Sequence, residues 1–458
     1  MIKFMKQKMN STSRIIFWGF FTVILLGAII LSLPVCAADG KGTNFVDALF
    51  TATTSVCVTG LVTVPTFSHW SIFGKIIILV LIQLGGLGVI CIATGFLVLI
   101  RKRITLTSRK IIQESYNLDT SQGMVVLVLK IIKTTALIEF LGAVGLSVRF
   151  IPQYGVIKGI IYSVFHSISA FCNAGIDLLG DSSLIPYVYD TYFNVVMIMI
   201  IISGGLGFIV WWEIIDLLKL AMKKQFSPSK IWERTSLHSK IVLVMTTLLL
   251  ILGFVVVMLL EYSNPQSIGN MSLGHKVLAS AFQSVTLRTA GFCTVAQGGF
   301  KVSTSMIMCI FMLIGGSPVG TAGGIKTTTF AIILIEVLSV VRGKDDAEAF
   351  RRKIDKENVR TALTVITISL VAAFSAMVIL SETEGASMKV IMYEVFSAVG
   401  TVGLSMDFTP TLSTLGKAVI IVLMFMGRIG PITMATTFAA KQVGAKEIEL
   451  PERRIIIG

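Results

Sequence analysis

The chain has 458 residues, of which 54% are hydrophobic and only 14% are charged, with a net charge of +14 and a mean hydropathy of +0.86. Soluble domains use about 45–50% apolar and about 25% charged residues. This composition excludes an ordinary soluble domain and indicates a protein embedded in a lipid bilayer.

Segments of low charge that are long enough to cross roughly 30 Å of hydrocarbon recur along the chain. Because no water is available there to hydrogen-bond the backbone, we expect these segments to be helices. They span residues 15–33, 76–100, 193–218, 241–260, 362–380 and 418–440.

The first segment has features of a cleaved signal peptide, with basic residues before it and Cys36-Ala37-Ala38 after it. Its apolar core is longer than the usual core of about 7–15 residues. We therefore expect it to be retained as the first membrane helix, and removal of the segment is the alternative.

Lysine and arginine gather in alternate connections, at residues 101–110, 219–240 and 342–360, and at both chain ends. Under the positive-inside rule these parts, including both termini, are cytoplasmic. The positive charge thus follows membrane topology, and we expect no nucleic-acid partner. The other connections are expected outside, and their acidic residues are Asp39, Asp47, Asp177, Asp181, Asp190, Glu382, Glu384 and Asp407.

Four short segments share one pattern, a half-helix rich in small and hydroxyl residues that is followed by a glycine. They span residues 50–60, 165–175, 282–291 and 396–403. Their last glycines, Gly60, Gly175, Gly291 and Gly403, recur at a nearly constant spacing of about 115 residues, which is typical of an internal repeat.

A second glycine motif follows each of these loops within the next apolar span, beginning at Gly85, Gly204, Gly315 and Gly427. Each repeat is therefore a span, a loop and a span, and an even number of spans gives all repeats the same orientation. We predict an all-α membrane protein of four such units, with eight transmembrane helices and four pore half-helices around a central pore. The expected units are residues 1–106, 107–223, 224–343 and 344–458.

Bare backbone at membrane depth is tolerated only inside protein or along a water-filled cavity, and here four such loops would converge on one axis. A ring of backbone carbonyls can replace the hydration shell of a cation, and glycine permits the backbone angles that such a strand needs. The alternative is that these glycines only allow close helix packing. The predicted potassium filter comprises Val56, Cys57, Val58, Thr59, Gly60, Phe171, Cys172, Asn173, Ala174, Gly175, Leu287, Arg288, Thr289, Ala290, Gly291, Val399, Gly400, Thr401, Val402 and Gly403. Asp177 and Asp407 follow the loop glycines, where they would draw cations to the mouth.

The apolar stretch 306–341 is too long for one membrane helix, and its residues 315–329 are rich in glycine and contain a proline, which oppose helix. We predict an intramembrane gating loop there. A phosphate-binding loop is the alternative, but Ile325 separates Gly324 from Lys326. We expect Lys326 to face the cytoplasmic vestibule or to cap the following helix. The gate residues are Gly315, Gly316, Ser317, Pro318, Val319, Gly320, Thr321, Ala322, Gly323, Gly324 and Arg428.

Arg428 occupies the place that glycine takes in the other three units, inside an apolar span, where a charge costs at least about 2.5–3.5 kcal/mol. We expect carbonyls of the gating loop to hold it; pairing with a buried acid such as Glu139 is the alternative. For Glu139 itself we expect Lys133 or a backbone donor as partner. Arg288 is expected to brace the third loop, with Glu394 as a conceivable partner.

The segments Val58-Thr59-Gly60-Leu61, 288–292 and 400–404 resemble the filter loops of the Trk/Ktr/HKT family. In that family a glycine in all four loops accompanies potassium preference. The chain starts directly with the first unit, as in the KtrB branch. The resemblance implies potassium uptake in the bacterial inner membrane, sodium as a possible activator, a homodimer, and a cytoplasmic KtrA-like regulatory ring that binds ATP or ADP.

A carrier that couples a small solute to sodium or protons is the alternative function, but such carriers are commonly built from inverted repeats. An enzyme would need a metal motif or an activated nucleophile, and the sequence has neither HExxH nor Gly-x-Ser-x-Gly. The six cysteines and four histidines are scattered without ligand spacing. We expect no enzymatic activity, no enzyme cofactor and no metal site beyond the transported potassium.

Overall fold

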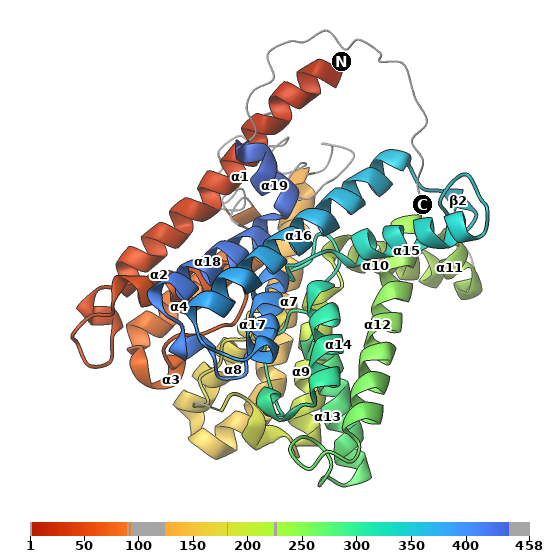
Figure 1. Ribbon diagram of the computed structural model, residues 1–458. Coiled ribbons are helices and arrows are strands. Elements are labelled where there is room, and N and C mark those ends of the chain that lie inside the picture. The colour runs from red at the N-terminus through yellow and green to blue at the C-terminus, as the bar shows by residue number, and fades with distance from the viewer. Residues whose placement is uncertain (1, 89–90, 93–123, 181, 224–226, 439–458) are drawn as a thin grey trace.

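The structure is a computed structural model that describes residues 2–88, 91–92, 124–180, 182–223 and 227–438. These residues form a helical bundle with a single two-stranded hairpin (Figure 1). The α-helices are α1 (Ile2–Leu31), α2 (Phe45–Val56), α3 (Thr66–His69), α4 (Ile72–Leu87), α7 (Met124–Tyr154), α8 (Val156–Phe171), α9 (Thr191–Gly205), α10 (Phe208–Met222), α11 (Ile231–Arg234), α12 (Leu237–Glu261), α13 (Leu273–Thr286), α14 (Val302–Leu313), α15 (Thr327–Val341), α16 (Lys356–Thr383), α17 (Met388–Gly400), α18 (Thr414–Ile429) and α19 (Pro431–Phe438). Short 3-10 helices are η1 (Pro34–Cys36), η2 (Ile185–Tyr187), η3 (Pro228–Lys230), η4 (Gln297–Gly299) and η5 (Thr409–Thr411), and the strands are β1 (Glu348–Ala349) and β2 (Arg352–Lys353).

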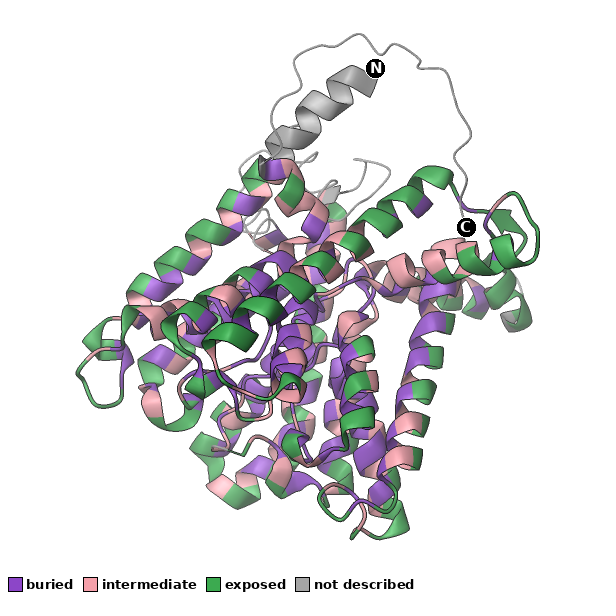
Figure 2. Ribbon diagram, viewed as in Figure 1, coloured by how far each residue is buried: buried purple, intermediate pink, exposed green. Residues whose placement is uncertain are grey.

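The long helices lie at the periphery and expose apolar side chains, while buried residues concentrate on the helices between them (Figure 2). Exposed side chains include Leu26 on α1, Leu259 on α12 and Val378 on α16. Within the described residues, three helices are long and apolar enough to cross a membrane, or up to five if each of two bent pairs counts as one span. The molecule is a multi-pass membrane protein.

A long helix followed by a short one recurs along the chain, and the short helix packs against the long one each time. The pairs are α1 with α2, α7 with α8, α12 with α13, and α16 with α17. The expected boundary at 106/107 lies outside the described residues and the one at 223/224 lies at their edge. The third, at 343/344, falls between α15 and β1.

Several of the second helices bend where the sequence indicated continuous spans. The span 193–218 is split into α9 and α10, which meet at 98°, and 418–440 is split into α18 and α19, which meet at 102°. The residues at the bends, Gly207 and Gly430, have φ of +92° and +89°, as does Gly88 after α4 with +84°. Only glycine adopts such angles without strain, so these glycines end the helices. The span 306–341 also breaks, between α14 and α15.

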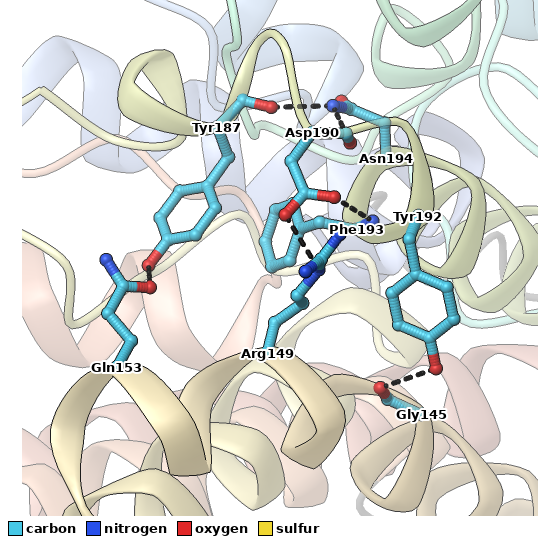
Figure 3. Close-up of polar contacts among 8 residues, drawn as sticks. All are labelled: Gly145, Arg149, Gln153, Tyr187, Asp190, Tyr192, Phe193 and Asn194. Carbon is cyan, nitrogen blue, oxygen red and sulfur yellow. Dashed lines mark hydrogen bonds and ion pairs between the residues drawn. The ribbon is translucent and has the colours of Figure 1, made fainter.

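A polar cluster fastens α7 to the start of α9 (Figure 3). Asp190 caps α9 by accepting from the backbone N–H of Phe193 at 3.0 Å, and it pairs with Arg149 at 2.9 Å. Tyr187 donates to Gln153 at 2.6 Å and Tyr192 donates to the carbonyl of Gly145 at 3.0 Å. These contacts fix the connection that follows the second loop.

The hairpin of β1 and β2 lies with α11 and the end of α15 at one end of the bundle (Figure 1). Lys353 and Lys356 flank Asp346 at 2.7 and 3.6 Å. The hydrogen bond from Lys353 lowers the pKa of the Asp346 carboxyl. This end carries the basic segment 342–360 that the sequence predicts to be cytoplasmic.

Candidate functional site

The four loop glycines meet one another although they lie far apart in the chain. A Cβ added to Gly60 would lie 2.7 Å from the carbonyl oxygen of Ala174, and one added to Gly175 would lie 2.8 Å from that of Ala290. One added to Gly291 would lie 2.7 Å from that of Val402, and one added to Gly403 would collide with that of Thr59. Each glycine therefore faces the carbonyl that precedes the glycine of the next loop, and the four contacts close a ring.

The backbone of the loops turns in the same way each time. The glycines have φ of +101°, +66°, +79° and +95°, and the residue two positions before each is also left-handed: Val58, Asn173, Thr289 and Thr401. Such angles in residues with a side chain cost about 1–3 kcal/mol each and persist only where the surroundings impose them. Their recurrence at equivalent positions shows that the four loops share one backbone conformation.

A hydroxyl from each short helix braces the strand that follows it. Thr54 accepts from the N–H of Gly60 at 2.9 Å, and Ser397 accepts from the N–H of Gly403 at 3.0 Å. Ser169 and Thr286 instead donate to the carbonyls of Ile176 and Phe292, each at 2.6 Å. The hydroxyl-rich sequence of the half-helices thus has a structural reason, which the sequence signalled without showing which hydroxyls serve.

A cavity of about 270 Å³ opens on one side of the glycine ring, and all four loop glycines line it. Residues that follow the glycines form its wall, among them Asp177 and Asp407. Two carboxylates at its wall give this cavity a negative potential that favours cations.

In three of the four units the second glycine motif lets the next helix approach the end of the short helix. A Cβ on Gly85, Gly204 or Gly427 would collide with the carbonyl of Val56, Phe171 or Val399. In the third unit Gly315 instead faces the carbonyl of Gly323 within the predicted gating loop.

The predicted gating loop contacts residues that precede the loop glycines, whereas the glycines and the residues after them line the cavity. Its Thr321 donates to the carbonyl of Phe171 at 2.8 Å, and its Gly324 N–H donates to the carbonyl of Gly427 at 3.2 Å. Ser317 N–H donates to Gly205 at 2.9 Å, and a Cβ on Gly323 would collide with the hydroxyl of Thr401. The loop is therefore held by the second and fourth units, directly behind the residues that precede the filter glycines.

Arg428 at the end of α18 reaches the loop from the fourth unit. Its guanidinium donates to the carbonyl of Thr321 in the loop and to the carbonyls of Gly85 and, at 3.1 Å, Gly86 in the first unit. These carbonyls lie at the end of α4 and in the loop, where helical pairing is incomplete, and the carbonyl of Gly85 also accepts from the N–H of Gly88 at 3.1 Å. Arg428 thereby connects three units.

Three further charged residues, Glu139, Arg288 and Lys326, have partners that the sequence did not indicate. Glu139 accepts from Gln83 at 3.1 Å, whereas we expected Lys133 or a backbone donor. Arg288 donates to the carbonyl of Gly315 at 3.4 Å, and within the described residues it forms no ion pair with Glu394. Lys326 donates to the carbonyl of Ala322 at 2.6 Å, so its side chain bonds within the predicted gating loop and makes no capping hydrogen bond to α15.

Every predicted filter and gate residue lies within the described part of the chain. The filter residues are buried except Gly403, which is half-buried. No group of histidine, cysteine, aspartate and glutamate suited to a metal occurs among the described residues. The groups that the loops present to one another at the ring are backbone carbonyls, which are ligands that an alkali cation takes.

The fold and this site define a multi-pass membrane protein in which four buried backbone loops meet at one ring. A family model described as TrkH, "Cation transport protein", matches residues 4–446. The potassium/sodium uptake protein NtpJ of Enterococcus hirae is 40% identical over 457 residues, which cover 99% of this chain and 98% of that protein. The Ktr system potassium uptake protein B of Bacillus subtilis is 40% identical over 440 residues, which cover 96% and 95% of the two chains.

The chain belongs to the TrkH family of cation transport proteins, which confirms the resemblance seen in its loops. The crystal structure of the potassium transporter TrkH from Vibrio parahaemolyticus shares its fold, with a TM-score of 0.71 and 16% identity over 92% of this chain and 84% of that one. As a member of a transporter family, the protein is not an enzyme.

Proposed function

We propose that this chain mediates potassium uptake across the cell membrane through a filter that the four loops form. The observation that carries the proposal is the closed ring in which each loop glycine faces the carbonyl of the next loop. Carbonyls gathered from four loops can replace the water around a potassium ion, and the cavity with Asp177 and Asp407 supplies cations to them. The names of two relatives support an alkali cation that includes potassium, since the E. hirae protein is named for potassium/sodium uptake and the B. subtilis protein for potassium uptake.

The proposed architecture has four parallel units of two spans and one pore loop, eight spans in all, with both termini in the cytoplasm of a bacterial cell. The recurring pairs of long and short helices support the repeat, and the basic segment beside the hairpin supports the orientation.

We further propose that residues 315–324 and Arg428 form the gate. The loop lies behind the filter strands, and the guanidinium holds it to the first unit. The chain would form a homodimer. A cytoplasmic KtrA-like ring that binds ATP or ADP would control the gate, and sodium would activate transport. The name "Ktr system" of the B. subtilis relative supports a transporter with more than one component.

The test is ion flux into liposomes that contain the purified chain, with and without its cytoplasmic partner. We expect potassium to enter much faster than sodium, and we expect the partner to change the rate. Equal rates for both ions would contradict the filter, and transport of an organic solute driven by sodium would favour the carrier class.

A further inference from the structure

Each of the four short helices carries a buried aromatic residue followed directly by a polar one. The pairs are Phe50 and Thr51, Phe165 and His166, Phe282 and Gln283, and Tyr393 and Glu394. They occupy equivalent places relative to the loop glycine, one residue closer in the third unit. In this register the fourth segment begins at Tyr393, whereas the sequence comparison placed its start at Phe396.

In two units the polar residue ties the short helix to the chain that leaves the filter. His166 Nε2 accepts from the N–H of Leu178 at 3.3 Å, and Gln283 donates to the side chain of Gln297 at 2.8 Å. Gln297 also accepts from the hydroxyl of Tyr393 at 2.7 Å, which joins the third unit to the fourth. In the first unit the hydroxyl of Thr51 donates to the backbone carbonyl of Asp47 on its own helix, at 2.8 Å.

In the fourth unit Glu394 connects the short helix to the chain that follows the loop, and it is the carboxylate among these four polar residues. It is fully buried and accepts from the hydroxyls of Ser405, at 2.7 Å, and Thr409. Ser405 in turn accepts from the N–H of Phe408 at 3.2 Å. Asp407 lies in the chain between Ser405 and Thr409, which these bonds hold, and its φ of +58° is left-handed. Ser405, Asp407 and Thr409 all line the cavity beside the glycine ring.

We propose that Glu394 is a positioning residue for potassium selection, which fixes the chain between Gly403 and Thr409 and with it the carboxylate of Asp407. This proposal deepens the function proposed above and rests on it. A carboxylate suits the role because it has two oxygens that only accept, so it receives both hydroxyls at once. A glutamine has one such oxygen, so one of the two hydroxyls loses its acceptor.

The test compares potassium uptake by Glu394→Gln with that by two variants of its partner. Thr409→Val keeps the shape of threonine without the hydroxyl, and Thr409→Ser keeps the hydroxyl. We expect Glu394→Gln and Thr409→Val each to raise the KM for potassium about 3–10-fold and to lower the potassium-to-sodium ratio, with kcat per folded molecule within about twofold. Thr409→Ser should retain the KM of the original chain.

The double variant Glu394→Gln, Thr409→Val should be no worse than the more severe single variant, because both remove one interaction. If Glu394→Gln raises KM while Thr409→Val does not, the carboxylate acts on the ion directly and the proposal is wrong. Unchanged KM in both variants also overturns it. If Glu394→Gln does not fold, the valine and serine variants at position 409 still decide. A wild-type chain without potassium uptake would overturn the proposed function, whatever the variants do.

Discussion

Replacement of Gly60 by serine tests the proposed filter directly, because a side chain at this position would meet three residues of the neighbouring loops. Its Cβ would lie 2.7 Å from the carbonyl oxygen of Ala174, 3.2 Å from Cα of Gly175 and 3.3 Å from Cα of Gly403. The favourable distance between such atoms is roughly 3.5 Å, so the carbonyl of Ala174 must move by roughly 0.5 Å or more. The φ of +101° adds backbone strain of about 1–3 kcal/mol.

The displaced carbonyl sets the expected size of the effect. An interaction between a neutral polar group and a charged one contributes about 1.5–3 kcal/mol net, and 1.4 kcal/mol corresponds to a factor of ten. We therefore expect Gly60→Ser to lower the potassium-to-sodium uptake ratio by about tenfold. Initial rates of uptake of the two ions into liposomes, normalised to folded protein, measure this ratio.

Gly40→Ser is the matched control. Gly40 also has a positive φ, +69°, but a Cβ there would have nothing within 4 Å. The control carries the backbone strain without displacing a carbonyl, and its ratio should stay at the original value. If Gly60→Ser folds and keeps its ratio, or if both variants lose selectivity alike, the carbonyl ring does not select the ion.

Further variants test the proposed gate and the polar cluster that joins α7 to α9. Arg428→Ala should raise potassium flux per folded molecule and weaken the dependence of this flux on the partner. Arg428→Lys should give an intermediate flux, because lysine keeps the charge without the planar guanidinium. A folded alanine variant with unaltered or lower flux rejects the gating role. Shortening residues 316–324 should also raise flux, and a folded variant that transports at the original rate would show that the loop is not the gate. Asp190→Ala should lower the free energy of unfolding by about 1 kcal/mol through loss of the cap on α9. Asp190→Asn keeps a capping oxygen and should lower the free energy of unfolding by less. Thermal unfolding in detergent measures both. Equal losses in both would assign the effect to the ion pair with Arg149.

The sequence predicted the loops because their pattern is local and repeated. Each bracing hydroxyl lies within seven residues of the atom that it bonds, as Thr54, Ser169, Thr286 and Ser397 show. The sequence therefore indicated that hydroxyls belong to the loops, although it did not indicate their partners. The break in 306–341 was legible for a similar reason, since its length exceeds what a membrane helix needs.

The bends at Gly207 and Gly430 and the end of α4 at Gly88 were not predicted, because glycines inside an apolar span also serve close helix packing. Both uses occur here within a few residues: Gly204 permits contact with α8, and Gly207 ends the helix. The partners of Glu139 and Arg288 were missed for a different reason. Gln83 lies on α4 and Gly315 in the loop after α14, and composition does not say which buried groups the fold brings together.

The contacts of Arg428 bear on how firmly the proposed gate can close. Its bonds to Thr321, Gly85 and Gly86 join a charge to carbonyls, and each such bond contributes about 1.5–3 kcal/mol net. Movement of the loop breaks the bond to Thr321 and leaves those to the first unit, so the guanidinium opposes opening by about that amount. Shifting an equilibrium from 1:99 to 99:1 takes about 5.5 kcal/mol. The remaining part must come from other contacts of the loop, among them the hydroxyl bond from Thr321 to Phe171 and the backbone bonds that hold Ser317 and Gly324. Arg428 is thus one component of the closed state, and its loss should shift the gate toward open without abolishing control by the partner.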